Sequence, residues 1–88
     1  MDELRQIREF IFRNFLFAED DGSLSNGDSL IASGTIDSTG VLELILFIEE
    51  TFGVKIAEEE MIPANLDSVD SIVAFLRHKR SETGGAGR

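Results

Sequence analysis

The sequence predicts a small all-α bundle with three main helices, one short helix, and a long loop between the first two main helices. Apolar residues recur at helical spacing in three separate stretches of the chain. The segments between these stretches are polar, contain glycine and show no sustained period. The length of 88 residues suits one small domain, which we place at residues 1–80, with a flexible glycine-rich tail at 81–88.

The first helix is expected from about Glu3 to Phe17. Acidic residues at Asp2 and Glu3 favour its start, because the amino-terminal end of a helix carries a partial positive charge. A long polar loop follows, from Glu19 to Thr35, and loops of this length in compact domains are usually functional or mobile. The apolar positions of the helix share one face: Leu4, Ile7, Ile11 and Phe15. The apolar residues expected to anchor the loop are Leu24, Leu30 and Ile31.

The second helix is expected from about Ser38 to Phe52. Gly53 follows at the position where helices commonly end. Its core stripe consists of Val41, Leu44, Ile45, Ile48 and Phe52. Two further leucines, Leu42 and Leu46, lie off that stripe and about one turn apart. They either face a partner protein or are covered by the long loop.

The carboxyl-terminal part predicts a short helix and the last main helix. Residues 57–62 are expected to form one helical turn that Pro63 stops. The last helix begins near Asp67 or Ser68, either of which can cap it. The buried face of this helix is expected to comprise Val69, Ile72, Val73 and Leu76. The basic residues expected near its negative end are Arg77, Lys79 and Arg80.

The charge distribution narrows the classes of function. The net charge is −9, and the span from Asn14 to Leu76 holds 13 acidic residues against one base, Lys55. This balance argues against a nucleic-acid partner, which would select basic patches. An acidic surface either keeps a small protein soluble or steers basic partners toward it. The chain has no cysteine for a disulfide or a thiolate metal site, and no apolar run approaches the roughly 20 residues of a membrane span. We therefore expect a cytoplasmic protein without a membrane partner.

Ser38 opens the second helix and is the first candidate functional residue. As an N-cap, its oxygen would accept a free backbone N–H two or three residues further on. The same position suits a phosphodiester, because free N–H groups and the helix dipole stabilise a phosphate there. A serine at this place can therefore be both a cap and an attachment point.

Two runs around Ser38 resemble the acyl and peptidyl carrier protein family. The first is the sequence Gly-Thr-Ile-Asp-Ser at 34–38, and the second is Phe-Ile-Glu-Glu-Thr-Phe-Gly-Val at 47–54. The similarity covers roughly residues 4–76, and the sequence Ile-Pro-Ala-Asn-Leu at 62–66 is similar to stand-alone aminoacyl carriers. The family usually has leucine or isoleucine directly after the serine, whereas this chain has Thr39 and then Gly40. Gly40 is expected to loosen the first helical turn by about 1 kcal/mol relative to alanine.

The resemblance implies a non-enzymatic, stand-alone (type II) carrier. Its serine, Ser38, preceded by Asp37, would take a covalent 4′-phosphopantetheine arm from coenzyme A, and the arm would hold an acyl or aminoacyl group as a thioester. The partners implied are a phosphopantetheinyl transferase, an acyl- or aminoacyl-activating ligase and downstream biosynthetic enzymes with basic docking surfaces. No metal is implied, and we expect a monomer. The docking positions carried over from the family are Thr39, Leu42, Glu43, Leu46, Glu49 and Glu50.

One other attachment site and two other classes of function compete with a carrier that is modified at Ser38. Asp28-Ser29-Leu30 matches the family's Asp-Ser-Leu text, but no helical stripe follows Ser29. The acidic loop could belong to a small non-covalent interaction or calcium-binding module, yet no register of it fits the EF-hand pattern. A hydrolase could pair Ser38 with His78, the one histidine, but the chain has no Gly-x-Ser-x-Gly elbow.

Overall fold

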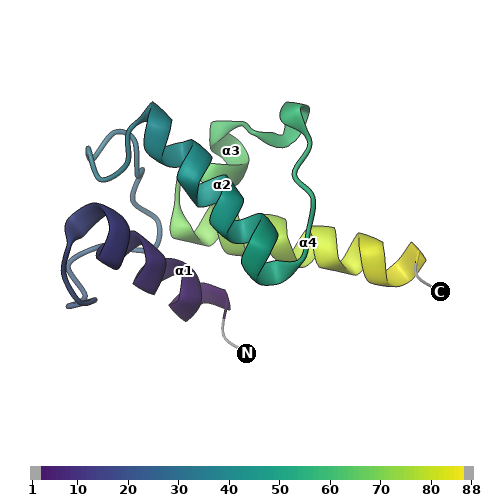
Figure 1. Ribbon diagram of the computed structural model, residues 1–88, viewed down its shortest axis with the longest axis horizontal. Helices are drawn as coiled ribbons and strands as arrows, with labels where there is room; N and C mark the ends of the chain where they lie inside the picture. Colours follow the sequence, from purple (N-terminus) through teal and green to yellow (C-terminus); the bar gives the residue numbers. More distant parts are fainter. Residues whose placement is uncertain (1–2, 87–88) are drawn as a thin grey trace.

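The computed structural model describes residues 3–86, with side chains described as far as Arg80. Within this range the chain is helical and has no strand, which confirms the predicted all-α class. None of the helices in the same range is long and apolar enough to cross a membrane. Figure 1 shows α2 crossing in front of α3 and the first half of α4, with α1 beside them. The elements are α1 (Glu3–Ile11), η1 (Phe12–Leu16), α2 (Ser38–Phe52), η2 (Glu58–Glu60), α3 (Pro63–Leu66) and α4 (Val69–Ala86).

One hydrophobic core joins the main helices and the long loop. Among the largest fully buried side chains, each helix contributes residues at the spacing that the sequence predicted. These include Ile7 and Ile11 of α1, Leu44 and Ile48 of α2, and Val69, Ile72 and Leu76 of α4. The core also takes in Phe75, which the predicted stripe of the last helix omitted.

The first helix ends one residue earlier than predicted and changes its winding. Its last turn, η1, is π-helical, and Phe17 follows in the left-handed region with φ 54°. The Phe17 N–H donates to the Phe12 carbonyl and so closes the helix end. The side chain of Phe17 is 84% exposed, so the turn is held by backbone geometry and not by burial of this ring.

The long loop is anchored by three apolar residues, of which two were predicted. Leu24 and Leu30 are buried, but Ile31 is 46% exposed, so its prediction as an anchor is wrong. Ile36 is the third anchor, at 2% exposure. Ile31 lies at the surface because the carboxylate of Asp67 accepts a hydrogen bond from the Ile31 N–H and holds this residue there. At the other end of the loop, the Arg8 guanidinium donates to Asp20, the Leu24 carbonyl and Asn26.

The second helix begins and ends where the sequence predicted. Gly53 is left-handed with φ 70°, and its N–H donates to the Glu49 carbonyl. A residue with a side chain would be strained in that conformation. The predicted stripe packs inward, with Leu44, Ile45 and Ile48 buried and its two end residues half-buried.

The segment between α2 and α4 contains two short helices instead of one. The predicted turn is the 3₁₀ turn η2, but Pro63 does not merely stop it: this proline is the first residue of α3. A proline fits there because the first helical N–H has no partner within the helix. Ser68 caps α4, since its Oγ accepts the Ser71 N–H at 3.1 Å. Asp67, the other candidate cap, binds the long loop instead.

The last helix continues beyond the predicted domain end. The backbone of residues 81–86, predicted as the start of a tail, belongs to α4, and residues 87–88 lie outside the described range. The sequence predicted the basic residues at 77–80 for the end of this helix, but the helix continues beyond them. They pair with acidic residues of other elements instead. Arg80 and Arg77 contact Glu3 at 2.7 and 4.0 Å, and Lys79 contacts Glu60 at 2.9 Å.

Candidate functional site

Ser38 is the first residue of α2, and its side chain is exposed. The prediction that it caps the helix is wrong, because Asp37 holds the cap position and its Oδ1 accepts the Gly40 N–H at 2.7 Å. A carboxylate is a strong acceptor at this place, since it also complements the helix dipole. The Ser38 hydroxyl forms no hydrogen bond with any residue that the structure describes. It is thus free for chemistry at the end of a rigid element.

An open groove of about 320 Å³ lies beside Ser38. Three chain segments meet around it: the long loop, the first turn of α2, and the chain from the end of η2 through α3. Most of the side chains that face it are apolar. The lining residues are Ile31, Ser38, Val41, Met61, Ile62, Pro63, Leu66 and Asp67.

Gly40 allows the first turn of α2 to pack closely against the end of the first helix. A Cβ at this position would lie 2.8 Å from Cε1 of Phe15 and 2.9 Å from Cγ2 of Ile36. Gly40 is buried, so close packing accompanies the cost in helix propensity that the sequence suggested. The glycine removes the atom that would push Phe15 and Ile36 away from the serine-bearing turn.

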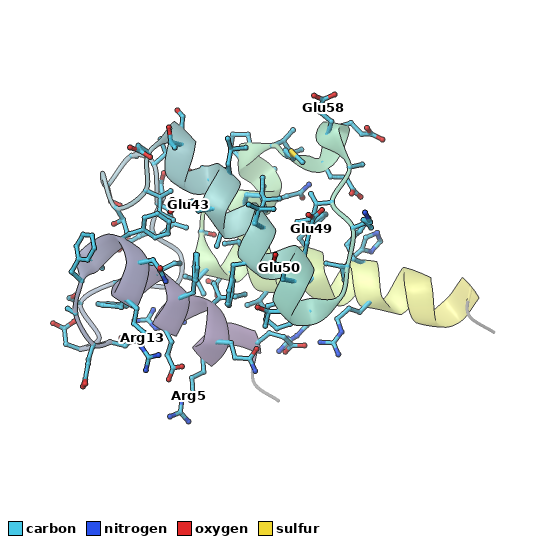
Figure 2. The ribbon with its side chains drawn as sticks, viewed as in Figure 1. Arg5, Arg13, Glu43, Glu49, Glu50 and Glu58 are labelled. Carbon is cyan, nitrogen blue, oxygen red and sulfur yellow. The ribbon has the colours of Figure 1, made fainter. Side chains whose placement is uncertain are left out.

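The exposed face of α2 presents leucines and carboxylates together. Leu42 and Leu46 are 59% and 57% exposed, so the long loop does not cover them. Glu43 and Glu50 are also exposed, and Figure 2 shows both on α2, well apart from Arg5 and Arg13 on the first helix and its π-helical turn. Thr39 is exposed one residue after Ser38. The helix therefore carries an apolar pair next to acidic side chains near the serine.

The chain is 33% identical over 78 residues to the probable acyl carrier protein PigG of Serratia sp. (strain ATCC 39006). The similarity covers 86% of this chain and 88% of that relative. The chain belongs to the acyl carrier protein family. No family model matches it.

Glu49 differs from Glu43 and Glu50, the other two glutamates on α2 of this acyl carrier family member. It was predicted as a docking residue, but it is half-buried, and its Oε2 accepts the Ile56 N–H at 2.9 Å. This bond ties the end of α2 to the segment that leads to η2. Glu49 therefore has a structural role in addition to any contact with a partner.

Ser29, the serine of the Asp-Ser-Leu text, is engaged within the acyl carrier fold. Its Oγ donates to Oδ2 of Asp67 at 2.5 Å and accepts the Ala32 N–H at 2.9 Å. The residue lies in a loop turn and not at the start of a helix. Its hydroxyl is thus occupied by structure, in contrast to that of Ser38.

The acidic loop residues also have structural partners in this acyl carrier protein. The hydrogen bond from Arg8 is the main cause that lowers the pKa of Asp20 to about 2. The pKa of Asp21 is lowered as well, chiefly by hydrogen bonds from Ser23. The pKa of Glu60 is lowered chiefly by the hydrogen bond from the Ala57 N–H and then by that from Lys79, with a smaller effect of His78. His78 is not among the residues around the groove beside Ser38.

Sequence reasoning missed the groove, because its residues are scattered over three segments. Met61 and Ile62 were not predicted as site residues, although they are 38% and 45% exposed and line the groove. Asp67 was considered only as a cap. The apolar run Met-Ile-Pro directly after three glutamates could have indicated the groove. A solvated turn does not require apolar side chains.

Proposed function

We propose that this protein carries an acyl or aminoacyl group as a thioester on a 4′-phosphopantetheine arm attached to Ser38, and presents that group to biosynthetic enzymes. The observation that supports this most strongly is the exposed Ser38 hydroxyl. It is the first residue of α2, has no partner among the described residues and adjoins an apolar groove. Membership of the acyl carrier protein family supports the same assignment.

The residues present around Ser38 fit a covalently attached phosphodiester. Asp37 takes up the Gly40 N–H, and the N–H groups of Ser38 and Thr39 have no acceptor within the helix. They lie at the positive end of α2, where a phosphate is stabilised. In the attachment step, Ser38 Oγ forms a bond to the pantetheine-side phosphorus of coenzyme A. The pyrophosphate P–O bond breaks, adenosine 3′,5′-bisphosphate leaves, and the hydroxyl proton passes to a base of the transferase.

The arm supplies chemistry that the chain lacks. The sequence has no cysteine, so a thiol for the thioester must come from the arm. Tethering then raises the effective concentration of the cargo at the active site of each partner. The groove beside Ser38 offers the apolar part of a cargo a place away from water. In this proposal the protein is a carrier and not an enzyme.

Partner enzymes would dock on α2 next to the arm. Thr39, Leu42 and Leu46 provide the contact surface, and Glu43 and Glu50 attract basic groups, with a smaller share for Glu49 because it binds Ile56. The partners are a phosphopantetheinyl transferase, an acyl- or aminoacyl-activating ligase, and enzymes that use the cargo. We further propose a monomeric, stand-alone (type II) carrier in the cytoplasm, acting without nucleic acid or a membrane.

Intact-mass measurement tests this function. The protein is incubated with coenzyme A and a broad-specificity phosphopantetheinyl transferase, and the wild type should gain the mass of one arm. Ser38→Ala should gain none and should keep its stability within about 0.5 kcal/mol, because Asp37 and not Ser38 caps the helix. Ser29→Ala should be modified like the wild type. A wild type that gains no mass would favour the alternative, a small acidic interaction module without a prosthetic group.

A further inference from the structure

The long loop is fastened to the end of α3 by hydrogen bonds that converge on one residue, Asp67. The Asp67 carboxylate accepts the Ser29 hydroxyl at Oδ2, 2.5 Å away, and the Ile31 N–H at Oδ1, 2.9 Å away. Its backbone carbonyl accepts the Leu30 N–H at 2.7 Å. The Ser29 oxygen in turn accepts the Ala32 N–H at 2.9 Å, which fixes the turn that contains all three loop residues. We call the Ser29 and Asp67 side chains the latch.

The latch decides where Ile31 lies. Leu30 is 1% exposed and points into the core, whereas Ile31, its neighbour, is 46% exposed and lines the groove beside Ser38. Asp67 also lines this groove. The loop is therefore tied to the α3 side of the groove by the Asp67 carboxylate, which binds Ser29 and the backbone of Ile31.

We infer that the latch controls how well the groove shields a cargo on the Ser38 arm. Closed, it keeps Ile31 at the rim of the groove, over the apolar part of a cargo that reaches into it. Open, the loop segment 29–32 leaves α3, and Ile31 moves away with it. This inference rests on the proposed function, and it assigns Ser29 and Ile31 as positioning residues without a part in attachment. It also gives a role to Ser29 of Asp28-Ser29, the Asp-Ser pair that does not open a helix.

Thioester cleavage on loaded protein tests the latch. A broad-specificity phosphopantetheinyl transferase loads each variant from acetyl- or octanoyl-coenzyme A, and intact mass follows cleavage of the thioester by hydroxylamine. Ser29→Ala should speed cleavage of the octanoyl form by about tenfold or more, the change expected when a hydrogen bond to a charged group is lost. The acetyl form should change little, because a two-carbon cargo has no apolar chain to shield. Ile31→Ala, an exposed substitution, should reproduce the octanoyl effect with the latch intact.

Two controls separate shielding from general loosening. Ser29→Thr keeps the hydroxyl and should restore the wild-type rate. Ser25→Ala, in the same loop, should behave like the wild type, because the contacts of Ser25 run through its backbone. Equal acceleration of acetyl and octanoyl cleavage, or none in Ser29→Ala and Ile31→Ala, would overturn the latch while leaving attachment to Ser38 in place. Failure of the wild type to take up the arm would instead overturn the proposed function, and the latch with it.

Discussion

At the scale of single residues, the start of α2 depends on three neighbours with separate tasks. Asp37 caps the helix, Ser38 presents a free hydroxyl, and Gly40 makes room for Phe15 and Ile36. The tasks are compatible because the capping oxygen belongs to the residue before the serine. A serine that had to cap the helix would hold its own oxygen against the backbone.

Gly40→Ala should destabilise the protein by up to about 2 kcal/mol. Alanine gains about 1 kcal/mol in helix propensity, but overpacking a buried site costs about 1–3 kcal/mol, and the new Cβ would lie under 3 Å from two side chains. Ile36 is 2% exposed and belongs to the hydrophobic core, so we expect the packing cost to prevail. Denaturant unfolding measures the change, with the exposed neighbour Thr39→Ala as control. A more stable Gly40→Ala protein would contradict the close packing described here.

At the scale of elements, α2 has two apolar faces with different environments. One face fills the core through Leu44 and Ile48, which are fully buried. The other shows Leu42 and Leu46 to solvent at more than half exposure. This second face is the surface on which we propose that partner enzymes dock.

Alanine substitutions on the two faces should separate folding from docking. Leu44→Ala and Ile48→Ala should each cost about 2–5 kcal/mol in unfolding free energy, because each leaves a cavity in the core. Leu42→Ala and Leu46→Ala should change stability by less than about 0.5 kcal/mol and should mainly slow modification or loading. Thermal melts and transfer rates of the four variants provide the comparison. Equal destabilisation on both faces would place Leu42 and Leu46 in the core.

The same helix shows what the sequence can and cannot predict. Its limits, its buried stripe and the glycine at its end follow from helical periodicity and from the left-handed conformation that Gly53 provides. The capping role of Asp37 and the bond from Ile56 to Glu49 do not follow, because neighbouring polar residues compete for the same backbone groups. The groove could not be predicted either. It depends on Ile31 pointing outward, which a hydrogen bond to Asp67, 36 residues away, decides.

At the scale of the whole molecule, the acidic side chains of α2 lie apart from basic side chains of the first helix. The span from Asn14 to Leu76 is acidic apart from Lys55, whereas Arg5 and Arg13 lie on the first helix and its π-helical turn, apart from the glutamates of α2 (Figure 2). Under the proposed function, this distribution would steer a partner with a basic surface toward α2. Arg8 forms an ion pair with Asp20 and so holds the acidic loop against the first helix.

Charge reversal on α2 should slow transfer of the arm through slower association. Glu43→Lys or Glu50→Lys should lower the apparent rate several-fold at low salt, and the difference should shrink as added salt screens exposed charges. Glu58→Lys is the matched control, because Glu58 is exposed but lies on η2, away from α2 in Figure 2. Rates that respond neither to salt nor to reversal at positions 43 and 50 would exclude this surface.

The Arg8–Asp20 pair should make stability depend on acidity in a defined window. The pKa of Asp20 falls from 3.8 to about 2 in the folded protein, so the pair stabilises the fold above about pH 4. That contribution is lost as the pH falls through about 2, and below this value Asp20 is protonated in both states. Asp20→Asn should therefore be less stable than the wild type at pH 7, and the two should converge below about pH 2. Glu19→Gln, at an exposed neighbour, should follow the wild type, and a deficit for Asp20→Asn that is independent of pH would contradict the ion pair.

The most direct test of the account is to locate the arm on the wild-type chain. After incubation with coenzyme A and a phosphopantetheinyl transferase, the protein is digested, and its peptides are fragmented in a mass spectrometer. We predict one phosphopantetheine, attached to Ser38, and an unmodified Ser29. An arm on Ser29 or on any other residue, or no arm at all, would contradict it.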